Sequence, residues 1–162
     1  MDAILQDREV NAGNPKGRVI LALFRLGQSI RRWPGPLWLL GSPILLLYVV
    51  LVEWIMGIEL GYKTSVGTRL RLYHATGLVV HPTACLGDDC TLRHSVTIGE
   101  RTTGGPCPII GNGVEIGCGA IILGAITVGD GAMIGAGAVV LEDVPARYIA
   151  VGNPARILPR ES

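Results

Sequence analysis

Residues 114–143 read VEIGCG-AIILGA-ITVGDG-AMIGAG-AVVLED, five consecutive hexads whose third residue is always Ile or Val. The same period of six extends back to residue 58, so that thirteen hexads can be written. Their third positions are all aliphatic: Leu60, Val66, Leu72, Val80, Leu86, Leu92, Ile98, Ile110, Ile116, Ile122, Val128, Ile134 and Val140. The next residue is glycine in eight of them, which indicates regular turns, because glycine adopts backbone angles that other residues resist.

A period of six with one aliphatic position predicts a parallel β-helix. Each hexad supplies one short strand and one sharp turn, and three hexads close one triangular coil. A sandwich or a doubly wound sheet would need strands about 8 to 12 residues apart or intervening helices, and neither pattern is present. We therefore expect an all-β domain, a hexapeptide-repeat β-helix, over residues 58–150.

The composition agrees with one turn-dense domain and excludes some functions. The chain has 162 residues, enough for one core, and contains 23 glycines. Its 14 basic and 13 acidic residues nearly balance, so no nucleic-acid partner is expected. The four cysteines form no CxxC pair, which argues against a zinc knuckle or a disulfide scaffold and fits a reducing cytoplasm.

An N-terminal helical, apolar segment is expected over residues 1–57. Residues 1–16 are polar and are expected to be loose, and residues 18–32 have the pattern of a short helix. Residues 33–36, Trp-Pro-Gly-Pro, then end that helix. A second helix, apolar on every face, is expected over residues 43–56 and must be covered by something.

The apolar run within this segment raises the question of a membrane. Residues 37–52 are interrupted at Gly41-Ser42-Pro43, so the run falls short of the roughly 20 residues of a spanning helix. We expect residues 37–56 to be buried or in peripheral contact with a membrane. The N-terminus has no basic region followed by an apolar run and a cleavage site, which favours a cytoplasmic protein. Residues 151–162 are expected to be a C-terminal tail.

Two interruptions of the hexads indicate where a site could form, because a regular solenoid offers no pocket. The first is the insertion Thr76-Gly77, which follows Tyr73-His74 closely. The second runs from Glu100 to Cys107 and lacks an inward aliphatic residue, so we expect an extruded loop there.

His74 and His94 are predicted to stack at one corner of the prism. Each lies two residues after an inward aliphatic residue, and 20 residues separate them, one coil of 18 plus the insertion. Strands on adjacent coils are about 4.8 Å apart, so each imidazole could affect the pKa of the other. His81 falls at a turn position, which argues against a zinc site built from three histidines, and no metal is expected.

Four segments resemble the serine acetyltransferase branch of the hexapeptide acyltransferases. They are His74-Ala75-Thr76-Gly77, Ser95-Val96-Thr97-Ile98-Gly99, Ile134-Gly135-Ala136-Gly137 and Gly152-Asn153-Pro154-Ala155-Arg156. The resemblance covers roughly residues 58–158 and implies a left-handed coil, a homotrimer and an active site between subunits. It implies that His74 is the general base and that Glu59 orients it, with His94 as a further catalytic candidate. The base would take a proton from an acceptor hydroxyl that attacks the thioester of acetyl-CoA.

The resemblance also implies where acetyl-CoA binds. Its pantetheine arm would run beside the extruded loop, past positions whose small side chains let backbone amides approach: Gly99, Gly104, Gly105, Cys118 and Ala136. Arg156 matches the nucleotide end, where a guanidinium suits a phosphate.

Two positions depart from the serine acetyltransferase pattern. That branch carries an acidic residue before the catalytic histidine and an Arg-His pair before the proline that matches Pro108; here these positions are Tyr73 and Pro106-Cys107. The short length, the apolar N-terminal segment and the stretches 93–99 and 107–115 most resemble the colanic acid and exopolysaccharide acetyltransferases, which modify sugar hydroxyls. We expect a carbohydrate acceptor contacted by Tyr73 and Cys107, at the inner face of the cytoplasmic membrane. A short serine acetyltransferase of cysteine synthesis and a non-catalytic trimeric scaffold are the alternatives.

Overall fold

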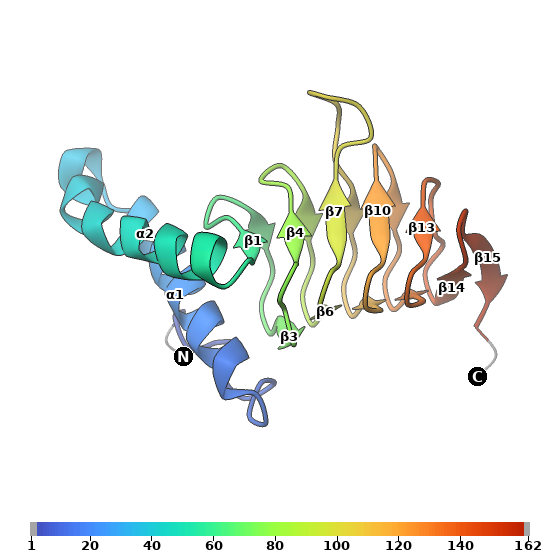
Figure 1. The fold of residues 1–162 in the computed structure, drawn as a ribbon, viewed down its shortest axis with the longest axis horizontal. Coiled ribbons are helices and arrows are strands. Elements are labelled where there is room, and N and C mark those ends of the chain that lie inside the picture. Colours follow the sequence, from blue (N-terminus) through green and yellow to red (C-terminus); the bar gives the residue numbers. More distant parts are fainter. Residues whose placement is uncertain (1–2, 161–162) are drawn as a thin grey trace.

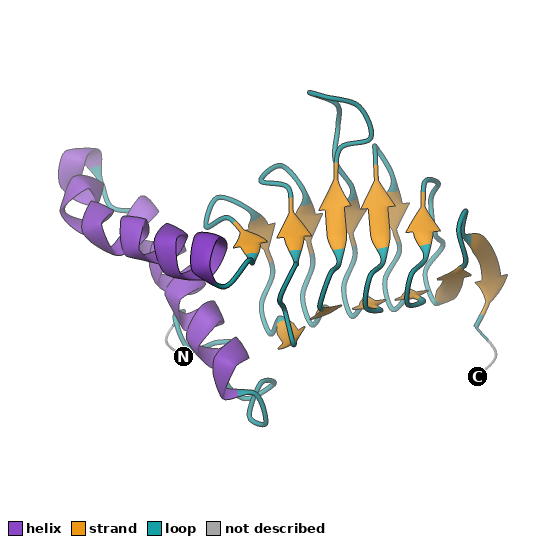
Figure 2. Ribbon diagram, in the orientation of Figure 1, coloured by secondary structure: helices purple, strands orange, loops and turns teal. Residues whose placement is uncertain are grey.

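The structure, a computed structural model, describes residues 3–160 as a helical segment followed by a prism of short strands (Figures 1 and 2). The helices are α1 (Pro15–Arg31), a 3-10 helix (Gly35–Gly41), α2 (Ser42–Tyr48) and a π-helix (Val49–Ile55). Three sheets form the faces of the prism in the described residues, and up to β13 every third strand joins the same sheet in parallel. The parallel β-helix that the hexads predict is therefore confirmed.

The strands are distributed among the faces as follows. The first sheet, which faces the viewer in Figure 1, contains β1 (Glu59–Leu60), β4 (Val79–Val80), β7 (Thr97–Gly99), β10 (Ile121–Leu123) and β13 (Val139–Val140). The second contains β2 (Ser65–Val66), β5 (Cys85–Leu86), β8 (Ile109–Ile110) and β11 (Thr127–Val128). The third contains β3 (Arg71–Tyr73), β6 (Thr91–Arg93), β9 (Glu115–Ile116), β12 (Met133–Ile134), β14 (Tyr148–Val151) and β15 (Arg156–Pro159).

Two columns of side chains, rather than one, fill the prism. The aliphatic residues at the third hexad position are buried, except Val66, which is half-buried. The first hexad position also points inward and is occupied by smaller or similar apolar groups in most coils: Leu70, Leu78, Ala84, Cys90, Val96, Val114, Ala120, Ile126, Ala132 and Ala138. The two columns alternate with the outward residue between them, as expected for a strand whose side chains alternate in direction.

The N-terminal residues cap the open end of the β-helix, so the expectation that residues 1–16 are loose is wrong for the part that the structure describes. β3 is the last strand of the third sheet, and within residues 3–160 its outer edge has no neighbouring strand. The carboxylate of Asp7 accepts a hydrogen bond from the Leu70 N–H (2.8 Å). Asn11 accepts from the Leu72 N–H (3.0 Å) and donates to the Leu70 carbonyl (2.8 Å). These bonds satisfy an edge that would otherwise be free to pair with another chain.

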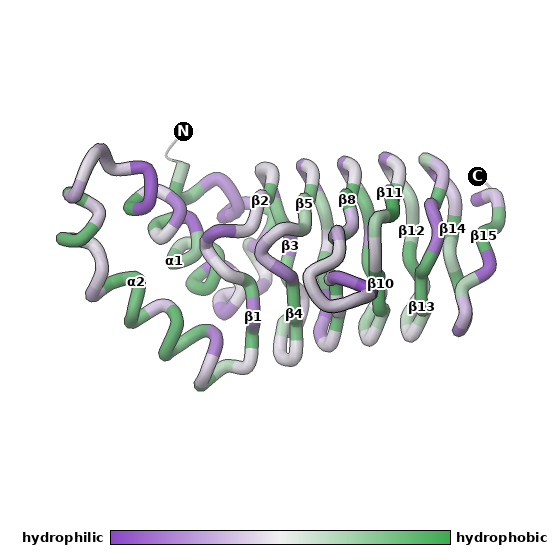
Figure 3. Tube along the Cα trace, turned by 90° about the horizontal axis from the view of Figure 1, so that it is seen from above, coloured by the Kyte–Doolittle hydropathy of each residue, from purple (hydrophilic) through white to green (hydrophobic). Residues whose placement is uncertain are grey.

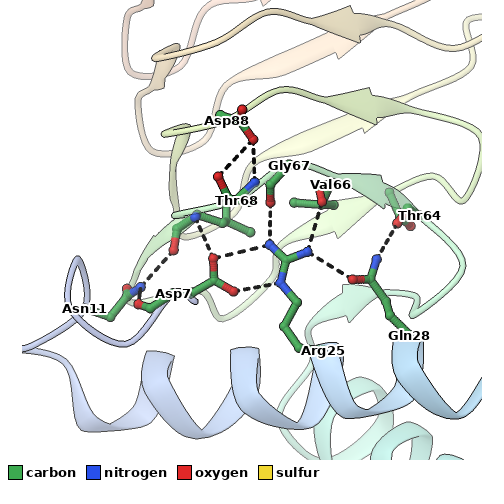
Figure 4. A network of polar contacts seen from close by, with 10 residues as sticks. Asp7, Asn11, Arg25, Gln28, Thr64, Val66, Gly67, Thr68 and Asp88 are labelled. Carbon is green, nitrogen blue, oxygen red and sulfur yellow. Dashed lines mark hydrogen bonds and ion pairs between the residues drawn. The ribbon is translucent and has the colours of Figure 1, made fainter. Parts of the chain in front are cut away.

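A buried ion pair connects this cap to α1 (Figure 4). The Arg25 guanidinium lies 2.8 Å from the Asp7 carboxylate, and both side chains are only 3% exposed. Arg25 also donates to the carbonyls of Val66 (2.9 Å) and Gly67, beside β2. The charge of Arg25 is therefore neutralised and its donors are used, as a buried charge requires.

The apolar helix is longer than the sequence predicts. Helical turns run without a break over residues 35–55, a stretch of 21 residues that is long and apolar enough to cross a membrane by length and composition. Gly41-Ser42-Pro43 does not interrupt it, because Pro43 lies in the first turn of α2, where a proline is tolerated. The prediction that this run falls short of a spanning length is therefore wrong. Figure 3 shows the largely hydrophobic colouring of α2 beside the β-helix.

The C-terminal residues extend the third sheet rather than leaving it. β14 pairs in parallel with β12, and β15 folds back to pair antiparallel with β14 through a turn that contains a cis Asn153–Pro154 peptide bond. Residues 151–159, expected as a tail, thus close the far end of the β-helix.

Candidate active site

Strand register places several of the predicted site residues in a single column. The partners Leu72, Leu92, Ile116, Ile134 and Ala150 follow one another across the third sheet. Two residues after each partner lie, in the same order, His74, His94, Cys118, Ala136 and Gly152. This corner column runs along the prism edge at which the chain leaves the third sheet and approaches the first. Backbone bonds link its coils, from the Gly119 N–H to the His94 carbonyl (3.0 Å) and from the Gly137 N–H to the Cys118 carbonyl (2.9 Å).

His74 and His94 are neighbours at the N-terminal end of this column, as their spacing predicts. Their ring centroids lie 6.5 Å apart and the rings are inclined at 72°. Both side chains are exposed to solvent. His74 has a φ of 54°, in the left-handed region, which turns the chain sharply before the Thr76-Gly77 insertion. An exposed imidazole can exchange protons with a bound hydroxyl, so this pair has the chemistry of a general base.

The residues just before the two histidines also lie together. Tyr73 and Arg93 are paired in register, and the Arg93 guanidinium lies 5.1 Å from the centre of the Tyr73 ring. Tyr73 is 39% exposed, so the stacked pair forms part of the surface beside the histidines. Arg93 is not among the site residues predicted from the sequence, although its position directly before His94 was the available signal.

Glu59 lies at the start of β1 and is exposed. Within residues 3–160, no side-chain hydrogen bond or ion pair joins it to His74. Its carboxylate lies instead close enough to Glu53 that its charge, after the effect of partial burial, raises the pKa of Glu53. The role of Glu59 in orienting His74 therefore stays a prediction.

The extruded loop lies at the opposite edge of the first sheet from the histidines. His94 precedes β7, and the loop Glu100–Cys107 begins directly after it; in Figure 1 this loop rises above β7. Its exposed tip is held by hydrogen bonds from the Gly104 N–H to the Glu100 carboxylate and from the Gly105 N–H to the Thr102 carbonyl (both 2.8 Å). A side chain at Gly105 would come within 2.8 Å of Thr102, so the tip requires glycine there.

The remaining predicted acetyl-CoA residues fall into three places. Gly99 is buried at the base of the loop, as the last residue of β7, whereas Cys118 and Ala136 belong to the corner column. Arg156 is exposed at the start of β15. One chain therefore does not bring all of these residues together.

Two further candidates are local features. Cys107 is half-buried and packs against the core at the end of the loop. His81 lies outside the corner column, and its Nδ1 is 2.9 Å from the Thr83 hydroxyl two residues away. Among the described residues, no group of three or more His, Cys, Asp or Glu side chains could hold a metal ion.

Comparisons with known proteins match either a part of the chain or nearly all of it. Residues 107–142 match the family described as bacterial transferase hexapeptide (six repeats). WcaB of Escherichia coli K12, whose name assigns it to colanic acid biosynthesis as an acetyltransferase, is 36% identical over 160 residues, covering 95% of this chain and 98% of that protein. Chloroplastic serine acetyltransferase 1 of Arabidopsis thaliana is 53% identical over 96 residues, covering 58% of this chain and 31% of that protein.

A solved structure shows the same architecture together with a ligand. Serine acetyltransferase of Brucella abortus in complex with coenzyme A aligns with a TM-score of 0.80 and 27% identity, covering 99% of this chain and 68% of that one. The alignment therefore includes the N-terminal helical segment as well as the β-helix.

Proposed function

Because the chain belongs to the hexapeptide-repeat transferases and is an acetyl-CoA-dependent acetyltransferase, we propose that it acetylates a sugar hydroxyl of an exopolysaccharide repeat unit. The observation that carries this proposal is the match with WcaB, which extends over nearly the whole length of both chains. The match with the plant serine acetyltransferase covers 58% of this chain, although its local identity is higher. WcaB is also matched over 98% of its own length, whereas the Brucella serine acetyltransferase, which aligns with 99% of this chain, is matched over only 68% of its own.

In the proposed mechanism, His74 acts as the general base. Its imidazole accepts the proton of the acceptor hydroxyl while the oxygen forms a bond to the thioester carbonyl of acetyl-CoA. The carbon–sulfur bond then breaks, and the proton passes from His74 to the departing sulfur, which yields the acetyl ester and CoA. His94, 6.5 Å away between ring centroids, is placed to influence the charge of His74 or to contact the acceptor.

The active site is proposed to lie between subunits of a homotrimer. The histidines and the extruded loop lie on opposite sides of strand β7, and this separation supports a site that a second chain completes. A neighbouring chain that places its loop against the corner column would supply the missing half. A cyclic trimer repeats such a contact three times and closes.

The surface beside His74 favours a sugar over an amino acid. Serine brings an ammonium and a carboxylate, and burying either without a partner costs several kcal/mol. Tyr73 and Cys107 are uncharged, so they supply no acid for the ammonium. The exposed Tyr73 ring, backed by Arg93, offers instead a flat face and a hydroxyl of the kind that suits a sugar ring.

The test is a comparison of acceptors in an assay of CoA release. We expect rapid release with an oligosaccharide or lipid-linked fragment of the polysaccharide from the same organism, and slow or no release with L-serine. The second candidate, a short serine acetyltransferase, is favoured by the 53% identity over 96 residues to the plant enzyme. A kcat/KM for L-serine of about 10⁴ M⁻¹s⁻¹ or above would establish that candidate and reject the proposal.

A further inference from the structure

The apolar helix over residues 35–55 is attached to the rest of the molecule along its length. Gly41 packs against Ile30 of α1, and the Tyr48 hydroxyl donates a hydrogen bond to the Leu60 carbonyl of β1. α1 in turn is fixed to the first coil by Arg25, which donates to the carbonyls of Val66 and Gly67 and pairs with the buried Asp7. At 1.5 Å per residue the helix is about 30 Å long, which matches the hydrocarbon thickness of a bilayer. A spanning orientation would nevertheless require these packed contacts to break.

The helix has two faces of different exposure. Gly41, Leu45, Tyr48 and Val52 recur at helical spacing and are buried against α1 and the first coil. The other faces expose large apolar side chains: Leu40 (75%), Leu46 (65%), Leu47 (51%), Trp54 (78%) and Ile55 (70%). A helix with one face packed on a protein and an apolar face exposed is suited to lie in the plane of a membrane interface.

Basic residues surround the N-terminal end of this helix. Two pockets there share Arg31, Tyr62 and Lys63 in their linings; one also contains Trp38, and the other Arg32. No acidic residue lines either pocket. Within residues 3–160, the three cations make no ion pair with an acidic side chain. Tyr62 connects the two features, because its ring contacts the Tyr48 ring edge to face at 6.2 Å between centroids.

The charge of the segment distinguishes a lipid from a second copy of the chain. Residues 10–58 contain five basic residues, of which Arg25 is neutralised by Asp7; four cations thus remain against a single acidic residue, Glu53. Glu53 lies in the C-terminal part of the apolar helix, whereas the cations gather at the other end. The helical segment of another copy would therefore bring further positive charge to this rim, whereas an anionic leaflet brings the opposite charge.

We propose that Arg31, Arg32 and Lys63 bind the phosphate of an anionic phospholipid headgroup while the helix over residues 35–55 lies in the membrane interface. Trp38, in the same pocket, and Trp33 would lie at the level of the headgroups, where tryptophan is favoured. Juxtamembrane basic residues attract anionic lipids by about 1 kcal/mol each. The enzyme would thereby be held where a lipid-linked sugar is presented, but the binding itself needs no acceptor.

The tryptophans allow a direct test. All three tryptophans of the chain, Trp33, Trp38 and Trp54, lie in or next to the apolar helix and are at least 43% exposed. The full-length protein would be titrated with vesicles of phosphatidylcholine alone and of phosphatidylcholine with phosphatidylglycerol. We expect a blue shift of the tryptophan emission and flotation with the vesicles, both stronger by at least about tenfold in affinity when phosphatidylglycerol is present.

A charge-matched pair of variants separates the proposed site from general electrostatics. Arg31→Gln/Lys63→Gln should weaken binding to the anionic vesicles by about 30-fold, and Leu40→Gln/Leu47→Gln should abolish it. Arg147→Gln/Arg160→Gln removes the same charge at the other end of the β-helix and should change binding less than about threefold. Circular dichroism would confirm that each variant is folded.

Several outcomes would overturn the proposal. Equal binding to neutral and anionic vesicles would rule out the proposed phosphate site. An equal loss of affinity in the two charge variants would show that the net charge of the protein, not this site, attracts the vesicles. A tryptophan emission that is already blue without vesicles and does not change with them would show that another copy of the chain covers the helix. None of these outcomes bears on the acceptor, which the CoA-release assay tests separately.

Discussion

The imidazole rings of His74 and His94 lie on successive coils of the β-helix, 6.5 Å apart between centroids and inclined at 72°. A coil of 18 residues and a two-residue insertion separate them, and the two strands that precede them stay in register despite the insertion. Its backbone is integrated into the coil, since the Ser95 N–H donates to the Thr76 carbonyl (3.0 Å) and the Gly77 N–H to the Gly57 carbonyl (2.8 Å). The regular solenoid is thus broken at one position without losing the stacking of the two side chains.

The first prediction concerns the proposed base. His74→Ala should lower kcat by about 10² to 10⁴, the usual contribution of a general base, with little change in the KM for acetyl-CoA. His94→Ala should lower it less. His81→Ala is the matched control, because that ring bonds only to its neighbour Thr83 among the described residues and lies outside the corner column. The kcat of each of the three variants is measured as CoA release with a thiol reagent.

Unchanged rates in both His74→Ala and His94→Ala would show that the base lies elsewhere. If, in addition, the wild-type rate with every acceptor tested were no higher than the background hydrolysis of acetyl-CoA, the alternative of a non-catalytic scaffold would be favoured. Loss of rate in His81→Ala equal to that in His74→Ala would indicate a structural effect instead.

The second prediction concerns the N-terminal cap. Asp7→Asn keeps an acceptor for the Leu70 N–H but leaves the buried charge of Arg25 without its partner, which should cost about 3 kcal/mol of unfolding free energy. Asp89→Asn removes the corresponding charge from the exposed pair with Arg69, whose side chains are 43% and 47% exposed, and should cost less than about 1 kcal/mol. Chemical denaturation of the two variants measures the difference. Equal effects would show that the cap does not contribute to stability.

The same cap shows what the sequence could not predict. The hexads specify the β-helix because each strand is local and its aliphatic residue recurs at a fixed interval. The bonds from Asp7 and Asn11 reach residues that lie 59 to 63 positions further along the chain. No local pattern reveals such partners, so a polar segment that caps a strand edge has the composition of a loose terminus.

The length of the apolar helix was predicted wrongly for a different reason. Gly41-Ser42-Pro43 contains helix-breaking residue types, but Pro43 occupies the first turn of α2 and Gly41 fits closely against Ile30. Position within the helix and tertiary packing decide whether such residues end it.

The candidate site was predictable where it depends on register alone. The stacking of His74 and His94 follows from counting residues, and so does the corner column that also contains Cys118 and Ala136. The partner of Glu59 depends on side-chain direction at the first coil, which spacing does not give. The register of Arg93 beside Tyr73 follows from the same count as the histidines, but the stacking of the guanidinium on the ring does not.

The third prediction uses Glu53, whose pKa is raised by partial burial and then by the charge of Glu59. A carboxyl with a raised pKa in the folded state contributes stability below its ordinary pKa of about 4.3, and that contribution is lost as the pH rises through the folded value. Glu53→Gln should therefore have a higher Tm than the wild type at pH 8, and the difference should shrink as the pH falls to about 4. Glu142→Gln, on an exposed side chain, serves as the control in thermal unfolding. A difference that stays constant with pH would contradict the effect of Glu53.

The last prediction tests whether the site is shared between subunits. His74→Ala keeps the extruded loop but lacks the base, whereas Gly105→Val keeps the base but brings a side chain within 2.8 Å of Thr102 and should displace the loop. Each homotrimer alone should be nearly inactive. In trimers assembled at random from equal amounts of both chains, an interface is intact when an unaltered His74 meets an unaltered loop of the neighbouring chain. This combination should occur at about a quarter of the interfaces, so co-expression of the two variants should restore up to about 25% of the wild-type rate. If base and loop served the same substrate within one chain, no mixed trimer would contain an intact site, and the mixture would remain as inactive as its two components.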